Sequence, residues 1–278
     1  MTGANRGLGF ATTLALARRG ARVVMACRDR SKGEAAAAEA RSLVPGARLE
    51  VAALDLASLA AVRDFAAARL AAGEPLRALV NNAGPINALP KLGFTADGFE
   101  AFFGANHLGH FLLTNLLLPL LRAGAPSRVV VVSSLRHARV RAFDWDNLRG
   151  EKGYDQGAFY DRAKLANLWF AYALARRLEG SGVEVVAACP GFVPRTLMAG
   201  RIGARRLMFA LLKRAPFART PEAAGEDLAR LAVDEGALAG ARFFSSGRPA
   251  RSSDLSRDEA AQERLWALSE GWTNLGPG

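Results

Sequence analysis

The chain alternates short, Val-rich apolar segments with longer Ala- and Leu-rich segments, and this alternation sets its fold class. We expect strands at 22–27, 48–54, 76–81, 128–133 and 183–188, with helical segments between them. The strand segments lack the polar alternation of a half-exposed sheet, so both faces of the sheet should be covered. Repeated β-α units imply right-handed crossovers. The sequence therefore predicts an α/β fold with a doubly wound parallel sheet in three layers.

Helices are expected on both faces of this sheet, and a last strand is expected before the final helix. The helices should lie at 8–19, 31–43, 59–71, 97–103, 106–121, 157–179, 221–233 and 258–269, and the strand at 241–244. No linker, low-complexity run or repeat divides the 278 residues, so we expect a single domain over 1–278.

A glycine-rich turn stands at the start of the chain. Gly3, Gly7 and Gly9 allow a turn without side-chain bulk, and the first expected helix follows directly. The free N–H groups and positive dipole end of such a helix can face a pyrophosphate. The spacing is neither G-x-G-x-x-G nor a P-loop, so the turn alone also fits an ordinary turn after a strand.

Ligands of doubly wound sheets lie beyond the carboxyl ends of the strands, and the residues there indicate a dinucleotide. Cys27 stands where an acid would accept the ribose hydroxyls of NAD, and Arg28 follows it. Arg28 and Arg6 could converge on a 2′-phosphate, for which guanidinium geometry is suited. The alternative is two solvated arginines. We favour NADP over NAD.

The next two strand ends carry further small and polar residues. Asp55 and Leu56 follow the third strand, where Asp55 either meets the adenine edge or caps the following helix. The fourth strand ends in Asn81-Asn82-Ala83-Gly84, which suits a backbone that approaches a ligand or holds two strand ends together.

Taken together, these motifs resemble the short-chain dehydrogenase/reductase family over essentially the whole chain. The motifs that carry the resemblance are Thr2-Gly3-x-x-x-Gly7-x-Gly9, Asn81-Asn82-Ala83-Gly84, Asn106, Ser134, Tyr160-x-x-x-Lys164 and Pro190-Gly191. The segments most similar to the retinol dehydrogenase-like branch are 106–111, 143–148, 160–167, 240–244 and 263–266. The resemblance implies a Rossmann-type fold, hydride transfer and a preference for NADP.

The resemblance also implies a set of cofactor-binding residues. They are Gly3, Asn5, Arg6, Gly7, Leu8, Gly9, Arg28, Asp55, Leu56, Asn82, Ala83, Gly84, Tyr160, Lys164, Pro190, Gly191, Val193 and Thr196. The segment 190–196 should close over the nicotinamide, with Thr196 as partner of the carboxamide, although Pro194-Arg195 lengthens the spacing common in the family.

The expected chemistry rests on Tyr160 and Lys164, which share one helix face at i and i+4. A nearby cation favours the phenolate and lowers the tyrosine pKa, so Tyr160 is the expected general acid of a reduction. Ser134 can donate to the substrate carbonyl, whereas Ser133 should point to the opposite face of the strand. By the resemblance, Asn106 holds a water that links Lys164 to solvent.

The segment 195–218 is expected to be a substrate lid inserted into the domain. Its part 200–218 is apolar and basic, which suits a lipophilic aldehyde, ketone or alcohol. Contact with an anionic membrane surface is the less favoured interpretation. The segment 190–196 also resembles light-dependent protochlorophyllide reductases, which gives one alternative function, and a non-catalytic NADP(H)-binding protein is a further alternative.

Charge, cysteines and histidines exclude several other classes of function. The net charge is +11, but the arginines are scattered among acids and alanines, so we expect no nucleic-acid partner. Cys27 and Cys189 should be free thiols on separated strands, and three histidines without a cysteine cluster give no metal site. No signal peptide or transmembrane run is evident, which favours a cytoplasmic protein; a homodimer is left open.

The position of the glycine turn carries one more expectation. In this fold the turn follows a central first strand, whereas only Met1 precedes Thr2 here. We therefore expect a strand of about five residues to be missing, through a late start, with a short Val/Ile-rich run upstream.

Overall fold

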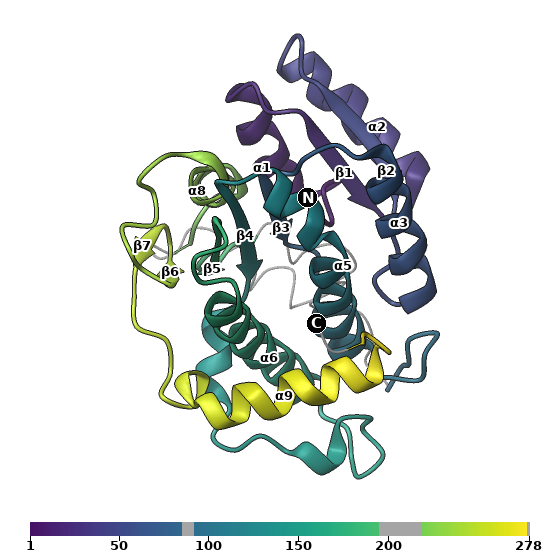
Figure 1. The fold of residues 1–278 in the computed structure, drawn as a ribbon, viewed down its shortest axis with the longest axis vertical. Coiled ribbons are helices and arrows are strands. Elements are labelled where there is room, and N and C mark those ends of the chain that lie inside the picture. The colour runs from purple at the N-terminus through teal and green to yellow at the C-terminus, as the bar shows by residue number, and fades with distance from the viewer. Residues whose placement is uncertain (85–91, 195–217, 277–278) are drawn as a thin grey trace, which may run out of the picture.

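The computed structural model describes residues 1–84, 92–194 and 218–276, and it has the three-layer α/β architecture expected (Figure 1). Five parallel strands match the segments predicted first, and each lies within about two residues of the expected bounds. They are β1 (Val23–Cys27), β2 (Leu49–Ala53), β3 (Ala78–Asn81), β4 (Ser127–Val132) and β5 (Val183–Cys189). The short β6 (Phe243–Ser245) adds a further parallel strand beside β5.

Two sets of helices cover the two faces of the strands, as the apolar strand segments require. One layer consists of α1 (Gly7–Arg18), α2 (Arg30–Leu43) and α8 (Pro221–Val233). The other layer consists of α3 (Leu59–Ala72), α5 (Gly109–Ala123) and α6 (Gln156–Arg177), with α9 (Glu259–Trp272) against α6. Along β4, Val130 and Val132 pack on the first layer, and Val129 and Val131 pack on the second.

The strands form two separate sheets rather than one. The first has the order β1-β2 and the second β3-β4-β5-β6-β7, where β7 (Arg248–Pro249) is antiparallel to β6. Thr2 stands between them: its N–H donates to the Val80 carbonyl at 3.1 Å, and it forms a β-bridge with Ala26. The place of the expected first strand thus holds a single bridge.

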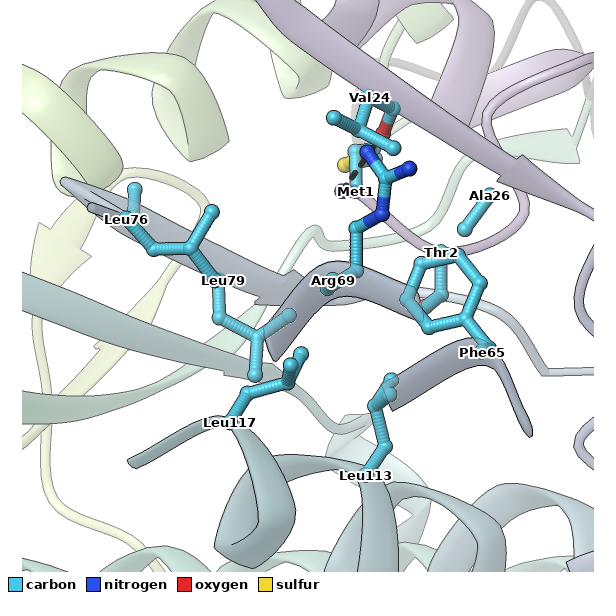
Figure 2. A pocket seen from close by; sticks show the side chains of 11 residues that line it. Met1, Thr2, Val24, Ala26, Phe65, Arg69, Leu76, Leu79, Leu113 and Leu117 are labelled. Atoms are coloured by element: carbon cyan, nitrogen blue, oxygen red, sulfur yellow. Dashed lines mark hydrogen bonds between the residues drawn. The ribbon is translucent and has the colours of Figure 1, made fainter. Parts of the chain in front are cut away.

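Beside this bridge lies a small, mainly apolar pocket between β1 and β3, closed by α3 and α5 (Figure 2). Its walls are formed by Met1, Thr2, Val24, Ala26, Phe65, Arg69, Leu76, Ala78, Leu79, Leu113 and Leu117. The Met1 amine donates to the Val24 carbonyl at 3.1 Å, and its burial lowers the pKa of this amine to about 6. The two sheets are joined by the contacts of Thr2 and by the helices that cover them.

Two predicted elements differ from the structure, and one strand of the structure was not predicted. The helix expected over 97–103 is reduced to α4 (Ala101–Phe103), because Gly98 has a φ of 77° and a bridge pairs Phe94 with Glu100. The helix expected over 106–121 begins as a π-helix, η1 (Gly104–Leu108), before α5. The strand β7 has two residues, too few to give a periodic signal.

No helix within the described residues is long and apolar enough to cross a membrane. Cys27 and Cys189 are free thiols and lie in different sheets, as the separated strands predicted.

Candidate active site

The glycine turn forms the start of α1 at the carboxyl end of β1 and β3. Gly3 and Gly7 have φ values of 64° and 55°, in the left-handed region that favours glycine. Within the described part of the chain, no side chain caps α1 at Arg6, and its first turn carries no acid. The N–H groups in the first helical turn of α1 can therefore bind water or an anionic ligand.

The turn is pressed against the end of β3, and this contact explains its composition. A Cβ at Gly9 would lie 2.0 Å from the Gly3 carbonyl oxygen, and one at Gly3 would lie 3.0 Å from the Ala83 Cα. The Asn82 side chain donates to the Thr2 carbonyl at 2.9 Å, and the N–H groups of Asn82 and Ala83 both donate to the Thr2 hydroxyl at 2.9 Å. Asn82 thus anchors the turn.

The end of β1 places two arginines beside this turn. Arg28 and Arg6 are both exposed, and neither belongs to an ion pair recorded among the described residues. Asp29 is already engaged, because its carboxylate caps α2 through the Lys32 N–H at 3.0 Å and pairs with the Lys32 ammonium at 2.6 Å. The Cys27 thiol accepts from the N–H groups of the turn, at Ala4 and Asn5.

Asp55 and Leu56 follow β2 in a tight turn. The Asp55 carboxylate accepts from the Ala57 N–H at 3.0 Å, while Ser58 caps α3. The alternative that Asp55 caps the following helix is therefore wrong, because that position is three residues further on. Leu56 packs on the start of α5, where a Cβ at Gly109 would lie 2.4 Å from the Leu56 carbonyl oxygen.

Ser134, Tyr160 and Lys164 come together beyond the carboxyl end of β4. The phenol of Tyr160 is buried and hydrogen-bonded to the Ser134 side chain. The Lys164 ammonium lies 5.7 Å from the centre of the Tyr160 ring and donates to the Val132 carbonyl at 3.1 Å. The hydroxyl of Ser133 instead donates to the Lys164 carbonyl at 2.7 Å, which leaves Ser134 as the serine beside the phenol.

The pKa of Tyr160 does not follow the expectation from the Tyr-Lys spacing. Burial raises it to about 12, more than the Ser134 hydrogen bond and the nearby Arg136 charge lower it. Lys164 is also buried, and this burial lowers the pKa of its ammonium to about 8. The expected lowering of the Tyr160 pKa was wrong for this structure, because desolvation of the phenolate outweighs the nearby charges.

Asn106 lies in the π-helix η1 and is buried beside Lys164. Its side-chain oxygen and nitrogen have no hydrogen-bond partner among the described residues. A Cβ at Gly84 would lie 3.2 Å from the Lys164 Nζ and 3.5 Å from the Asn106 Oδ1, so Gly84 leaves the approach to both groups free. Unpaired buried amide atoms need water or a ligand, and π-bulges are frequent at functional sites.

His110 connects the glycine turn to Asn106, a role that the sequence did not indicate. Its Nε2 lies 2.9 Å from the Thr2 hydroxyl, and its Nδ1 lies 3.0 Å from the Asn106 carbonyl oxygen. Burial lowers the pKa of His110 to about 4, so the ring is neutral at physiological pH. The contact with Thr2 exists because the fold brings α5 beside the glycine turn.

The segment after β5 contains the remaining predicted cofactor residues. The Pro190 carbonyl accepts from Arg219 at 3.0 Å, and Gly191 has a φ of 81°. Val193 is buried. Thr196 and the expected lid over 195–218 lie outside the described residues, except for Ala218, which bridges to Phe192.

Comparison with known proteins gives a consistent picture. The family model described as short chain dehydrogenase matches residues 1–206. Human retinol dehydrogenase 11 is 42% identical over 270 residues, which cover 97% of this chain and 83% of that protein. The dehydrogenase/reductase SDR family member 13 of Bos taurus is also 42% identical, over 100% of this chain and 73% of that protein.

Two solved structures agree with these sequence relatives. An uncharacterized protein from Mycobacterium Paratuberculosis is 36% identical, with a TM-score of 0.75 over 98% of this chain and 91% of that chain. A metagenomic short-chain oxidoreductase in complex with NADP is 27% identical, with a TM-score of 0.59 over 83% of this chain and 88% of that chain.

Proposed function

The chain belongs to the short-chain dehydrogenase/reductase family, and from this premise we propose that it transfers a hydride between NADP(H) and a lipophilic aldehyde, ketone or alcohol. It is an oxidoreductase that acts on CH–OH and C=O groups. The observation that carries the proposal is the convergence of Ser134, Tyr160 and Lys164 beside Gly84 and the unpaired amide of Asn106. Several of its relatives are named retinol dehydrogenases, which supports a lipophilic substrate.

The residues fit a nicotinamide dinucleotide at this site. The glycine turn and the uncapped start of α1 would hold the pyrophosphate, and Gly84 leaves room above Lys164 and Asn106. When bound, the cofactor supplies or accepts the hydride.

The chain's own residues manage the proton. A phenol with a pKa of about 12 is protonated at neutral pH, so Tyr160 can donate its proton to the carbonyl oxygen during reduction. The Ser134 hydroxyl is placed to hydrogen-bond the same oxygen. Lys164, with a pKa of about 8, can exchange a proton near neutral pH, and the unpaired amide of Asn106 would hold the water that returns it.

The direct test of this function is NADPH oxidation against a panel of aldehydes, ketones and retinoids, with NADH in parallel. We expect turnover with lipophilic carbonyls and faster turnover with NADPH. Tight NADPH binding without turnover of any carbonyl would favour the non-catalytic alternative. Light-dependent turnover of protochlorophyllide alone would favour the other alternative.

The preference for NADP is proposed from Arg28 and Arg6. Replacement of Arg28 by Asp should raise the KM for NADPH by about 10–100-fold, because a charge-assisted contact contributes about 1.5–3 kcal/mol. The KM for NADH should change little. The matched control is Arg30→Asp, two residues further on, where the side chain is exposed and pairs with Glu34 at 3.7 Å. Equal effects of both substitutions, or a wild-type preference for NADH, would contradict the assignment.

The expected lid leads to a separate proposal about membranes, since its apolar and basic composition also suits an anionic surface. Salt-sensitive retention of the protein on anionic vesicles, absent with neutral vesicles, would support this contact. A cytoplasmic location and a homodimer stay predictions.

A further inference from the structure

A further arginine, Arg136, lies against the ring of Tyr160. It stands on η2 (Leu135–Arg139), the short helix that follows β4, and its guanidinium carbon is 5.3 Å from the centre of the Tyr160 ring. The Nε donates to the Asp161 carboxylate, and Nη2 donates to the Gly157 carbonyl at 3.1 Å. Its backbone N–H donates to the Ser134 hydroxyl at 3.3 Å.

We propose that Arg136 is a positioning residue of this site, held by Asp161 so that its positive charge lies against the Tyr160 ring and stabilises the deprotonated phenol. The inference rests on the proposed function, because it assigns a proton-transfer role to Tyr160. It adds a residue that acts through Tyr160 rather than on the substrate.

The attachment of Arg136 makes its position over the ring well defined. Asp161 directly follows Tyr160 on α6, so the fold brings the carboxylate and the phenol ring to the same guanidinium. The Asp161 side chain is 10% exposed and that of Arg136 37% exposed, so the pair is only partly screened by water. A guanidinium held at two points over an aromatic face is the arrangement in which cation–π attraction is effective.

Among the described residues, two cations lie over the Tyr160 ring, Arg136 and Lys164. Asp161 on α6 and Cys189 at the end of β5 both raise the pKa of Tyr160, whereas the charge of Arg136 lowers it. Lys164 lies 5.7 Å from the ring centre, but its ammonium donates to the Val132 carbonyl.

The other ring contact of Tyr160 recorded among the described residues is uncharged. On the α4 side the ring meets the edge of Phe102, an apolar contact with ring centres 6.0 Å apart. The negative charge of Asp155, the N-cap of α6, raises the pKa of Arg136 and so favours its charged form. Removal of the Arg136 charge should therefore disfavour the phenolate.

The test uses the full-length protein with tyrosine labelled at the ¹³Cζ position, whose NMR signal reports ionisation without any turnover. The chain has three tyrosines, so Tyr160→Phe assigns the signal of Tyr160. We expect Arg136→Met to move the onset of Tyr160 ionisation about one pH unit higher, at the lower end of the effect of a nearby charge. The signals of Tyr154 and Tyr172 should stay unchanged.

Arg162→Met is the matched control. Arg162 stands on α6, and like Arg136 it pairs with an acid, Asp144 at 3.3 Å, and lies over a ring, that of Phe159, at 5.0 Å. Arg136→Gln removes the charge but keeps a donor for Gly157, and serves if the Met variant does not fold. Arg136→Lys keeps the positive charge, so its onset of Tyr160 ionisation should lie close to that of the unmodified protein. Equal onsets in the Arg136→Gln, Arg162→Met and unmodified proteins would overturn the proposal.

Alcohol oxidation gives a second readout, since it requires the deprotonated phenol. At a fixed pH below the Tyr160 midpoint, Arg136→Met should lower kcat for oxidation about tenfold, because the rising limb of the pH profile moves about one unit higher. If no carbonyl is reduced and no alcohol is oxidised, the proposed function fails, and the NMR titration still decides the role of Arg136. If oxidation occurs and neither readout moves, only the role of Arg136 fails.

Discussion

Replacement of Tyr160 by Phe is expected to lower kcat/KM for carbonyl reduction by about 10²–10⁴-fold, the usual contribution of a general acid. The substitution removes the phenol proton and keeps the ring that packs on Phe102, so the fold should be unaffected. The Kd for NADPH, measured by quenching or calorimetry, should rise by no more than about tenfold, because the loss of one hydrogen bond costs about 0.5–1.5 kcal/mol.

The control for this variant is Tyr172→Phe on the same helix. The Tyr172 hydroxyl lies 2.7 Å from the Ser252 Oγ, remote in sequence from the Ser134 cluster, so its loss should affect stability slightly and activity little. Undiminished reductase activity of the Tyr160 variant would contradict the mechanism and leave the dinucleotide site intact.

Replacement of Gly9 by Ala is expected to abolish tight NADPH binding. The new Cβ would lie 2.0 Å from the Gly3 carbonyl oxygen, which is backbone, and 2.8 Å from the Asn82 Nδ2, which is held by its hydrogen bond to the Thr2 carbonyl. The turn must move away from β3. Overpacking of this kind costs about 1–3 kcal/mol, and a displaced turn loses its aligned N–H groups as well, so we expect at least a 100-fold rise in the Kd.

Gly271→Ala provides the comparison within the same protein. Gly271 lies in α9, and no heavy atom of the described chain would come within 4 Å of its Cβ. Alanine should stabilise this helix by up to about 1 kcal/mol. Thermal unfolding of both variants separates a local loss of binding from a global loss of structure. An unchanged Kd in the Gly9 variant would exclude the turn as the phosphate site.

The elements that the sequence predicted well are those with a local cause. The apolar runs around Val129 and Val185 could only be strands covered on both faces, and the structure buries both residues. Asn81 to Gly84 were expected where a backbone approaches a ligand, and Asn82 in fact ties the glycine turn to β3. Such signals depend on composition and on short spacing, which a single chain displays directly.

The features that the sequence missed depend on contacts between distant segments. The contact of His110 with Thr2 joins residues 108 positions apart, and the pair of Arg136 and Asp161 joins residues 25 apart. The direction of the Tyr160 pKa shift also failed, because spacing shows the neighbouring Lys164 but not the depth of burial. The π-helix at Asn106 changes the helix by one hydrogen-bond step, which leaves no mark on periodicity.

The division of the strands into two sheets has a consequence for ligand binding. Arg28 belongs to the β1-β2 side and Tyr160 to the β3–β7 side, and Thr2 supplies the bridge between them. A dinucleotide that reached from one side to the other would fasten both at once. Saturation would then raise the opening free energy of amide hydrogens in β1 and β2 toward that of the global unfolding, and ligand and architecture would share one cooperative unit.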